Sequence, residues 1–233
     1  MMEHTQKIPT IALFILSAAI ANAQTLVIDD FDSYTDTTEL QANWNSFGNA
    51  ATSGAPLLAA GQGVDGSNAA AFSLNWFATG ASNANMRRIN LTSLDLSSYD
   101  FLDVNLFVET DTGNDSPTNP TILKIAFQSS DSTIWQTSLS FALEPNLDAY
   151  SLLSFELSET AMERVSGSGS FADSIVDITN IRLRFENVEE ANVGQTAFVS
   201  SIVASTIPEP STYALGFGLA MAGTVLLWRR KAQ

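Results

Sequence analysis

The sequence predicts an all-β domain, an antiparallel β-sandwich, and three observations lead to this prediction. Apolar and polar residues alternate over short runs, as they do in half-buried strands. Turns rich in Gly, Asn, Asp and Ser separate these runs. Long helical periodicity is absent from the middle of the chain. About nine or ten short strands in this arrangement favour two packed antiparallel sheets.

The clearest predicted strand covers residues 101–109, where Leu102, Val104, Leu106 and Val108 fall on one face. The other strands are expected at 26–31, 70–77, 86–91, 121–128, 133–141, 150–155, 181–185 and 196–204. The one candidate for a helix in this region is 158–165.

The first 23 residues have the organisation of a secretion signal. A polar start with one lysine precedes the apolar run 10–20, and Ala21-Asn22-Ala23 supplies the small residues that signal peptidase requires. We therefore expect a signal peptide over 1–23, cleaved before Gln24. The alternative, an uncleaved anchor or a buried helix, is disfavoured because the apolar run is short for a membrane span.

The C-terminus, 207–233, contains Pro208-Glu209-Pro210, then an apolar stretch over 213–228, then Arg229-Arg230-Lys231. As a helix, the stretch would be about 24 Å long, against a hydrocarbon core of about 30 Å. Such a short helix can insert if the bilayer thins locally. The basic cluster then predicts a transmembrane helix with its C-terminus in the cytoplasm and the domain 24–206 outside.

This C-terminal arrangement resembles the PEP-CTERM sorting signal of Gram-negative bacteria. The resemblance implies that an exosortase, a membrane cysteine transpeptidase, recognises and cleaves the tail. It also implies display at the outer surface or in an extracellular matrix, in association with extracellular polysaccharide and biofilm. The alternative is a plain single-span anchor in which the prolines form only a linker.

Composition excludes several classes of activity. The chain has no cysteine, and its only histidine, His4, lies in the predicted signal peptide. Without them the domain can form no Ser-His-Asp or Cys-His nucleophilic site and no ordinary zinc site. The domain keeps 23 of the 25 acidic residues and six basic ones, a formal charge of −17. Such a surface repels nucleic acid and attracts divalent cations.

Within the domain, a series of features resembles the jelly-roll sandwich of galactose-binding-like carbohydrate-binding modules. In order, these are residues 27–32, Trp44, the turn 63–66, residues 95–102 and a closing strand at 196–204. The resemblance covers nearly the whole domain and implies a jelly-roll topology and a polysaccharide ligand.

The same resemblance implies a structural calcium ion, held by acids near the first strand. Asp29, Asp30 and Asp32 match this part of the pattern. The last strand departs from it, because Ser200 and Ser201 stand where an Asp pair is expected. Calcium requires six to eight oxygen ligands, so the departure weakens the site. The loop 111–115 is a second oxygen-rich candidate, although such loops are more often simple turns.

Sugar binding requires aromatic rings that stack on the sugar and polar groups that reach its hydroxyls. Trp76 and Trp135, with Asn75 and Arg87, are the predicted binding residues. Further candidates are Trp44, Tyr99 and Arg88. For each aromatic residue, core packing is the alternative role. Arg182 and Arg184 share one strand face and are interpreted as solvating it. The G-x-G-x-x-G run at 61–66 is interpreted as a turn, since a strand follows it.

The leading hypothesis is an exported, non-enzymatic protein that binds polysaccharide. Its expected partners are an exosortase, extracellular polysaccharide and, before processing, the membrane, with no nucleic acid. The alternatives are a structural component of the extracellular matrix and a polysaccharide hydrolase. The hydrolase is disfavoured because no spacing in the sequence singles out a catalytic carboxylate pair.

Overall fold

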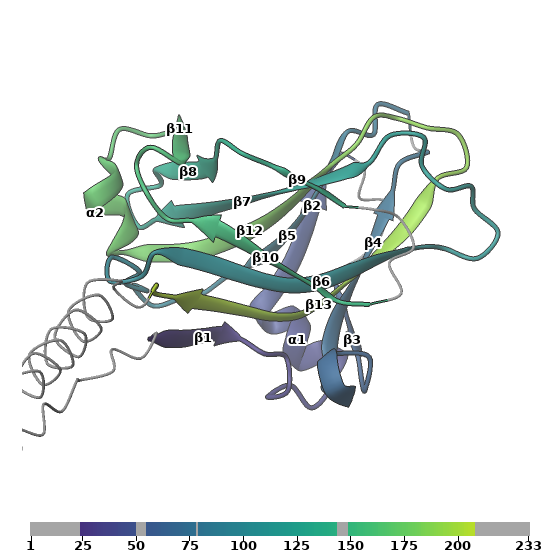
Figure 1. Cartoon of the computed structure of the whole chain (residues 1–233), viewed down its shortest axis with the longest axis horizontal. Helices are drawn as coiled ribbons and strands as arrows, with labels where there is room; N and C mark the ends of the chain where they lie inside the picture. Colours follow the sequence, from purple (N-terminus) through teal and green to yellow (C-terminus); the bar gives the residue numbers. More distant parts are fainter. Residues whose placement is uncertain (1–23, 50–54, 78, 144–148, 208–233) are drawn as a thin grey trace, which may run out of the picture. The chain divides into compact units, whose positions relative to one another are not determined.

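Two antiparallel β-sheets pack face to face in the computed structural model, which describes residues 24–49, 55–77, 79–143 and 149–207 (Figure 1). The described residues belong to one structural unit, Gln24–Ile207. The predicted antiparallel sandwich is therefore confirmed. The predicted signal peptide, the sorting signal from Pro208 onward and the transmembrane helix 213–228 lie outside the described residues.

The first sheet has six strands in the order β10-β6-β13-β4-β3, and β1 also pairs with β13. Its longest strands, β6 and β13, lie side by side at its centre. The strands are β1 (Thr25–Asp29), β3 (Leu57–Ala59), β4 (Ala69–Asn75), β6 (Phe101–Thr110), β10 (Ser151–Glu156) and β13 (Gly194–Ser205).

The second sheet has seven strands in the order β11-β8-β7-β12-β5-β2, and β9 also pairs with β7. In Figure 1, β7, β8 and β12 lie above β6, β13 and β1 of the first sheet. The strands are β2 (Trp44–Gly48), β5 (Asn83–Arg88), β7 (Thr121–Ser129), β8 (Ile134–Thr137), β9 (Phe141–Leu143), β11 (Met162–Ser166) and β12 (Ile178–Glu186).

The core forms where the alternating apolar residues of the two sheets meet. On β6 the predicted inward set is confirmed, because Leu102, Val104, Leu106 and Val108 are all buried. Side chains of the second sheet, such as Met86, Leu123 and Phe185, belong to the same buried cluster. Each such side chain contributes roughly 1.5–3 kcal/mol when fully buried, so the alternation is the main source of stability.

Two short helices and several strands differ from the predictions, and β2 and β3 fall outside every predicted strand. The helix candidate at 158–165 is wrong, because β11 pairs there with β8 and this long-range pairing overrides the local pattern. Helix α1 (Thr37–Asn43) was not predicted, although the Asp36 side chain caps it by accepting from the backbone N–H of Glu39. Helix α2 (Phe171–Ile175) is similarly capped by Ser170.

The predicted strand 133–141 is divided into β8 and β9. The run at 61–66 contains a 3₁₀ turn, η1 (Val64–Gly66), between β3 and β4, as the turn interpretation predicts. Among the described residues, no helix has the length and apolar character needed to cross a membrane.

Candidate functional site

The outward side of the seven-stranded sheet carries a row of side chains that crosses six strands. The strand register sets Asn45, Arg87, Arg182, Ala126, Gln136 and Glu163 opposite one another in turn. A second row runs beside it through Phe47, Asn85, Arg184 and Lys124. We call this surface the polar face; it comprises Asn45, Phe47, Asn85, Arg87, Ile122, Lys124, Ala126, Gln128, Gln136, Glu163, Arg182, Arg184 and Glu186.

Strand β12 lies at the middle of the polar face. Ile181, Leu183 and Phe185 are fully buried, whereas Arg182 and Arg184 between them are partly exposed. Because side chains alternate across a strand, burial of the apolar set places both arginines on the outward side. The hydrophobic core therefore determines which way the arginines point.

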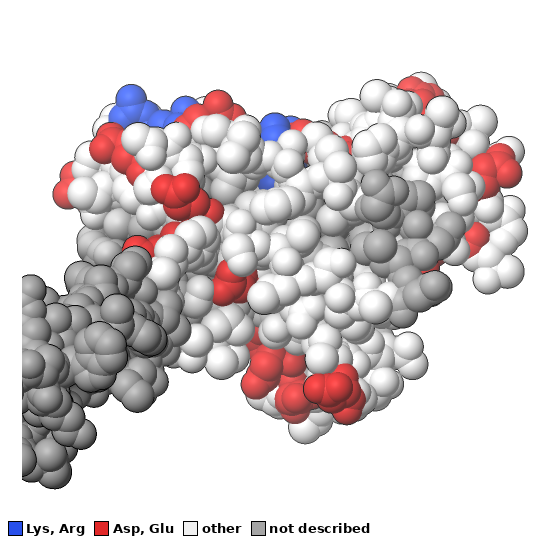
Figure 2. Space-filling model, viewed as in Figure 1, with Lys and Arg blue, Asp and Glu red and all other residues white. Residues whose placement is uncertain are grey.

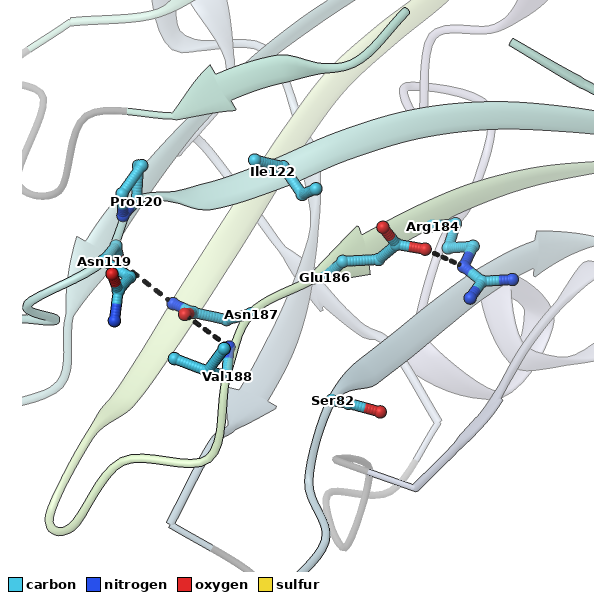
Figure 3. Close-up of a pocket in the computed structure, with 8 residues that line it drawn as sticks. All are labelled: Ser82, Asn119, Pro120, Ile122, Arg184, Glu186, Asn187 and Val188. Carbon is cyan, nitrogen blue, oxygen red and sulfur yellow. Dashed lines mark hydrogen bonds and ion pairs between the residues drawn. The ribbon is translucent and has the colours of Figure 1, made fainter. Parts of the chain in front are cut away.

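The polar face is hollowed on both sides of Arg184. A hollow of about 430 Å³ lies toward the end of β12, lined by Arg184, Glu186, Asn187 and others (Figure 3). A second hollow of about 210 Å³ is lined by Arg184, Arg182, Gln136 and others. The larger hollow falls within the range of ligand pockets, about 300–1,000 Å³. Arg184 contributes to both hollows.

Two arginines of the polar face are held in place by neighbouring side chains. Nε of Arg87 donates to Oδ1 of Asn45 at 3.0 Å, and a terminal nitrogen of Arg182 donates to Oε1 of Gln128 at 2.7 Å. Both guanidinium carbons also lie near the Phe47 ring, 5.0 Å and 5.4 Å from its centroid. Cation–π attraction at these distances favours the observed positions. The two guanidinium groups are thus ordered before any ligand binds.

The larger hollow has a single carboxylate among its described lining residues, that of Glu186. Its oxygens lie 2.5 Å from Nε of Arg184 and 3.4 Å from Nζ of Lys124. Figure 3 shows Arg184 and Glu186 pointing toward each other. Glycoside hydrolysis requires two carboxyl groups on opposite sides of the bond, so these lining residues do not supply a catalytic pair.

The predicted sugar-stacking residues Trp76 and Trp135 lie in the core. Trp76 has no exposed surface and Trp135 has 6%. The indole N–H of Trp76 donates to Gln195 at 3.1 Å, and that of Trp135 donates to Ser174 at 3.2 Å. Neither ring has a face free to stack on a sugar, so this prediction is wrong. Each tryptophan lies at an inward position of a strand or at a strand end, so its ring is buried in the hydrophobic core.

The other residues predicted to bind sugar lie in different parts of the structure. Arg87 lies on the polar face, as described above, whereas Asn75 lies at the end of β4 in the other sheet, opposite Gly194. Trp44 is fully buried, and Tyr99 is half-buried against the core. Of the predicted sugar-binding residues, the structure therefore brings only Arg87 to the polar face.

Asp29, a predicted calcium ligand, is buried in a hydrogen-bond network. Its Oδ2 accepts from the Tyr34 hydroxyl at 2.7 Å and from the Trp44 indole N–H at 2.8 Å. Nε of Arg88 lies 3.4 Å from the same oxygen. Burial, together with the hydrogen bond to Asp29, raises the pKa of Tyr34. Because Arg88 already supplies the positive charge, Asp29 does not fit the role of calcium ligand.

The remaining predicted calcium ligands make separate contacts. Oδ1 of Asp30 accepts from the backbone N–H of Asp32, and Oδ1 of Asp32 accepts from the backbone N–H of Asn68. Ser200, where the resemblance implies an acid, accepts from the backbone N–H of Val64. No cluster of three or more acidic or histidine side chains suited to a metal occurs in the described part of the chain. Calcium at Asp30 and Asp32 stays a prediction.

The loop 111–115 has the structure of a turn. The backbone N–H of Asn114 donates to the carbonyl of Asp111, and Oδ1 of Asp111 accepts from the Thr196 hydroxyl. Asp111 is thereby used to hold the loop against β13. The turn interpretation accounts for these contacts without an ion.

A second surface with aromatic residues lies on the outward side of the six-stranded sheet. The rings of Phe107 and Phe198 stack on each other at 4.7 Å, and Tyr150 meets Phe107 edge-on at 4.8 Å. The Tyr150 hydroxyl also donates to the carbonyl of Gln62. Because Phe107 and Phe198 stack face to face, each has less ring surface available for stacking on a sugar than an isolated ring would have.

Sequence reasoning missed most of the polar face. The sequence interpretation of Arg182 and Arg184 is that they solvate a strand face, and no local pattern marks Phe47, Lys124 or Gln136 as binding residues. Alternation at 121–128 and 181–185 does identify which residues point outward. It does not identify which strands are neighbours in the sheet. The pairing of those strands is what aligns their side chains into the two rows of the polar face.

Comparison with solved structures identifies the class of fold. A family 11 carbohydrate-binding module from Clostridium thermocellum, solved with a β-1,3-1,4-mixed-linked tetrasaccharide, is similar with a TM-score of 0.50 and 14% identity. The likeness covers 77% of this chain and 94% of the module. An exo-β-agarase is similar with a TM-score of 0.51 and 11% identity, over 78% of this chain but 25% of the agarase. The domain thus has the β-sandwich fold found in carbohydrate-binding modules.

The C-terminus provides the second comparison. Residues 206–231 match the family model described as the PEP-CTERM protein-sorting motif. The chain therefore carries this sorting motif at its C-terminus, as the sequence predicts. No protein of curated function matches the chain in sequence.

Proposed function

We propose that this chain is an exported, non-catalytic protein whose β-sandwich binds polysaccharide on the polar face. The observation that carries the proposal is the pair of hollows on either side of Arg184, lined by guanidinium and amide groups. Such groups form hydrogen bonds with sugar hydroxyls, and a site spread over several strands suits a chain of sugars better than a single one. The β-sandwich shared with a carbohydrate-binding module supports the same function.

A binding role accounts for the polar face better than hydrolysis does. Glu186 is ion-paired on both sides, with Arg184 and Lys124, so its carboxylate oxygens are already engaged within the protein. The likeness to the agarase covers a quarter of that enzyme, so it does not argue for catalysis here.

The sorting motif supports an extracellular location. In this proposal the signal peptide 1–23 directs export, and an exosortase recognises Pro208-Glu209-Pro210 together with the apolar helix and Arg229-Arg230-Lys231. Display at the surface or in the matrix of a Gram-negative cell would then bring the polar face to its polysaccharide. Replacing Pro208, Glu209 and Pro210 by alanine should make the unprocessed precursor accumulate in cells that contain an exosortase. Processing that continues unchanged would contradict this part of the proposal.

Binding is tested by titrating the full-length chain, purified in nonionic detergent, with a panel of neutral and acidic polysaccharides. At least one polysaccharide should bind, and Arg184→Ala should weaken its binding roughly tenfold or more through loss of a charged hydrogen-bond donor. Arg164→Ala is the matched control. Arg164 is an exposed arginine of β11 that contacts the carbonyls of Ser168 and Gly169.

Two results would contradict the proposal. One is that no polysaccharide in the panel binds. The other is that Arg164→Ala and Arg184→Ala weaken binding equally, which would place the site elsewhere. Melting temperatures of both variants show whether a loss of binding comes from loss of folding.

A further inference from the structure

The basic residues of the domain are concentrated on the polar face. Arg87, Lys124, Arg182 and Arg184 lie there with two acids, Glu163 and Glu186, which gives this surface a formal charge of +2. The rest of the domain has two basic and 21 acidic residues, a formal charge of −19. Figure 2 shows the visible Lys and Arg side chains near the upper edge of the view, whereas Asp and Glu occur both there and over the rest of this face.

The positive charges face one another across the strands. Arg182 lies opposite Arg87 on one side, and Arg184 lies opposite Lys124 on the other. Like charges in directly opposed positions destabilise a sheet. Burial, with Arg87 and Arg184 nearby, lowers the pKa of Arg182 below its ordinary value, although an arginine stays charged. Among the described contacts, Arg184 and Lys124 form ion pairs with Glu186, whereas Arg87 and Arg182 donate only to amide oxygens.

Two of these cations have no anionic partner among the residues that the structure describes. Within the described residues, neither Arg87 nor Arg182 has a carboxylate within 4.0 Å, and Nε of Arg182 is buried without a hydrogen-bond partner. In contrast, Glu186 pairs with Arg184 and Lys124. The uncompensated charge is therefore located at Arg182, which lines the smaller hollow together with Gln136, and at Arg87 opposite it on the neighbouring strand.

Resting on the proposed function, we infer that the polar face selects acidic polysaccharides, with a carboxylate or sulfate group of the sugar bound between Arg87 and Arg182. Guanidinium groups match the planar geometry of such anions and form bonds about twice as strong as those to neutral acceptors. A bound anion would also remove the repulsion between the two arginines. Asn85 and Gln136 flank the smaller hollow and would accept and donate hydrogen bonds to neighbouring hydroxyls.

The charge of the whole domain distinguishes such a ligand from nucleic acid. Duplex DNA carries about one charge per 1.7 Å of axis and would be repelled by the acids around the polar face. A polysaccharide carries its charged groups among many neutral hydroxyls. It can therefore place an anion between two arginines while presenting mostly neutral groups elsewhere.

The test compares charged polymers with their neutral counterparts. The full-length chain is titrated with polygalacturonate and with carboxyl-reduced polygalacturonate, and likewise with dextran sulfate and dextran. At least one anionic polymer should bind tenfold or more tightly than its neutral counterpart, and added salt should weaken that binding. Whichever polymer binds identifies carboxylate or sulfate as the recognised group.

Variants locate the anion. Arg87→Gln and Arg182→Gln should each weaken binding of the anionic polymer roughly tenfold, whereas Arg164→Gln should leave it unchanged. Equal binding of charged and neutral polymers would overturn the inference but leave the proposed function intact. Duplex DNA that binds as tightly as the polysaccharide would also overturn it, because the face would then be a general polyanion site. If no polysaccharide binds in the wider panel, the proposed function itself fails.

Discussion

Arg182 of β12 lies directly opposite Arg87 of β5, and both guanidinium groups rest near the ring of Phe47. The pair combines electrostatic repulsion with side-chain contacts that hold it in place. This combination is typical of a binding surface, where residues are arranged for a ligand and not for the stability of the free protein.

The first prediction separates binding from stability at this pair. Arg87→Gln should change the free energy of unfolding by less than about 1 kcal/mol, because relief of repulsion offsets the lost bond to Asn45. Urea denaturation measures this change. A loss above about 2 kcal/mol would show that Arg87 has mainly a structural role, and Arg164→Gln serves as the control for loss of one positive charge.

The second prediction concerns the core tryptophans. Trp76→Phe should lower the free energy of unfolding by about 2–3 kcal/mol, since it leaves a void and removes the bond to Gln195. Polysaccharide affinity should stay within about twofold of wild type, because the ring is buried. Calorimetric titration alongside thermal unfolding checks both parts. A large loss of affinity in a stable Trp76→Phe variant would show that Trp76 contributes to polysaccharide binding and would contradict this prediction.

The third prediction concerns the network of Asp29. Asp29→Asn should cost about 3 kcal/mol of stability, because it leaves Arg88, whose side chain is 18% exposed, without its carboxylate partner. Asp30→Asn, at an exposed position next along the chain, should cost less than about 0.5 kcal/mol. Chemical denaturation of the two variants compares them directly. Equal effects would mean that the network contributes little.

The fourth prediction is a loss of stability in alkaline solution. The pKa of Tyr34 is raised by burial and by Asp29, so the folded protein holds this proton more strongly than the unfolded chain does. The stabilisation is complete below the ordinary tyrosine pKa of about 10 and is lost as the pH rises through the higher pKa of the folded state. Burial also raises the pKa of Tyr150, to about 12. Urea denaturation from about pH 9 to 11.5 should show falling stability, with a smaller fall in Tyr34→Phe; equal slopes would contradict this account of Tyr34.

The sequence identifies strands well where one face of a strand is buried. At β6 and β12 the apolar residues at every second position predict both the strand and its inward face. It identifies short elements poorly when distant contacts determine them. Strand β11 has one buried residue, Met162, and exists because it pairs with β8. Helix α1 is seven residues long, and its capping residue Asp36 is the main local signal.

The binding surface was harder to predict than the fold, for a physical reason. Tryptophan is the residue expected for sugar stacking, yet Trp44, Trp76 and Trp135 supply large apolar surfaces to the core. The polar face instead depends on register between strands that are distant in sequence. Arg182 meets Arg87 because β12 pairs with β5, and no local pattern records that pairing.

The most direct test of the account is hydroxyl-radical footprinting of the full-length chain with and without a bound polysaccharide. Phe47, 37% exposed on the polar face, should be protected by the ligand. Phe107 and Phe198, on the outward side of the other sheet, provide an internal reference and should react as before. Protection of Phe107 and Phe198 with no change at Phe47 would place the polysaccharide on the opposite sheet and contradict the central claim.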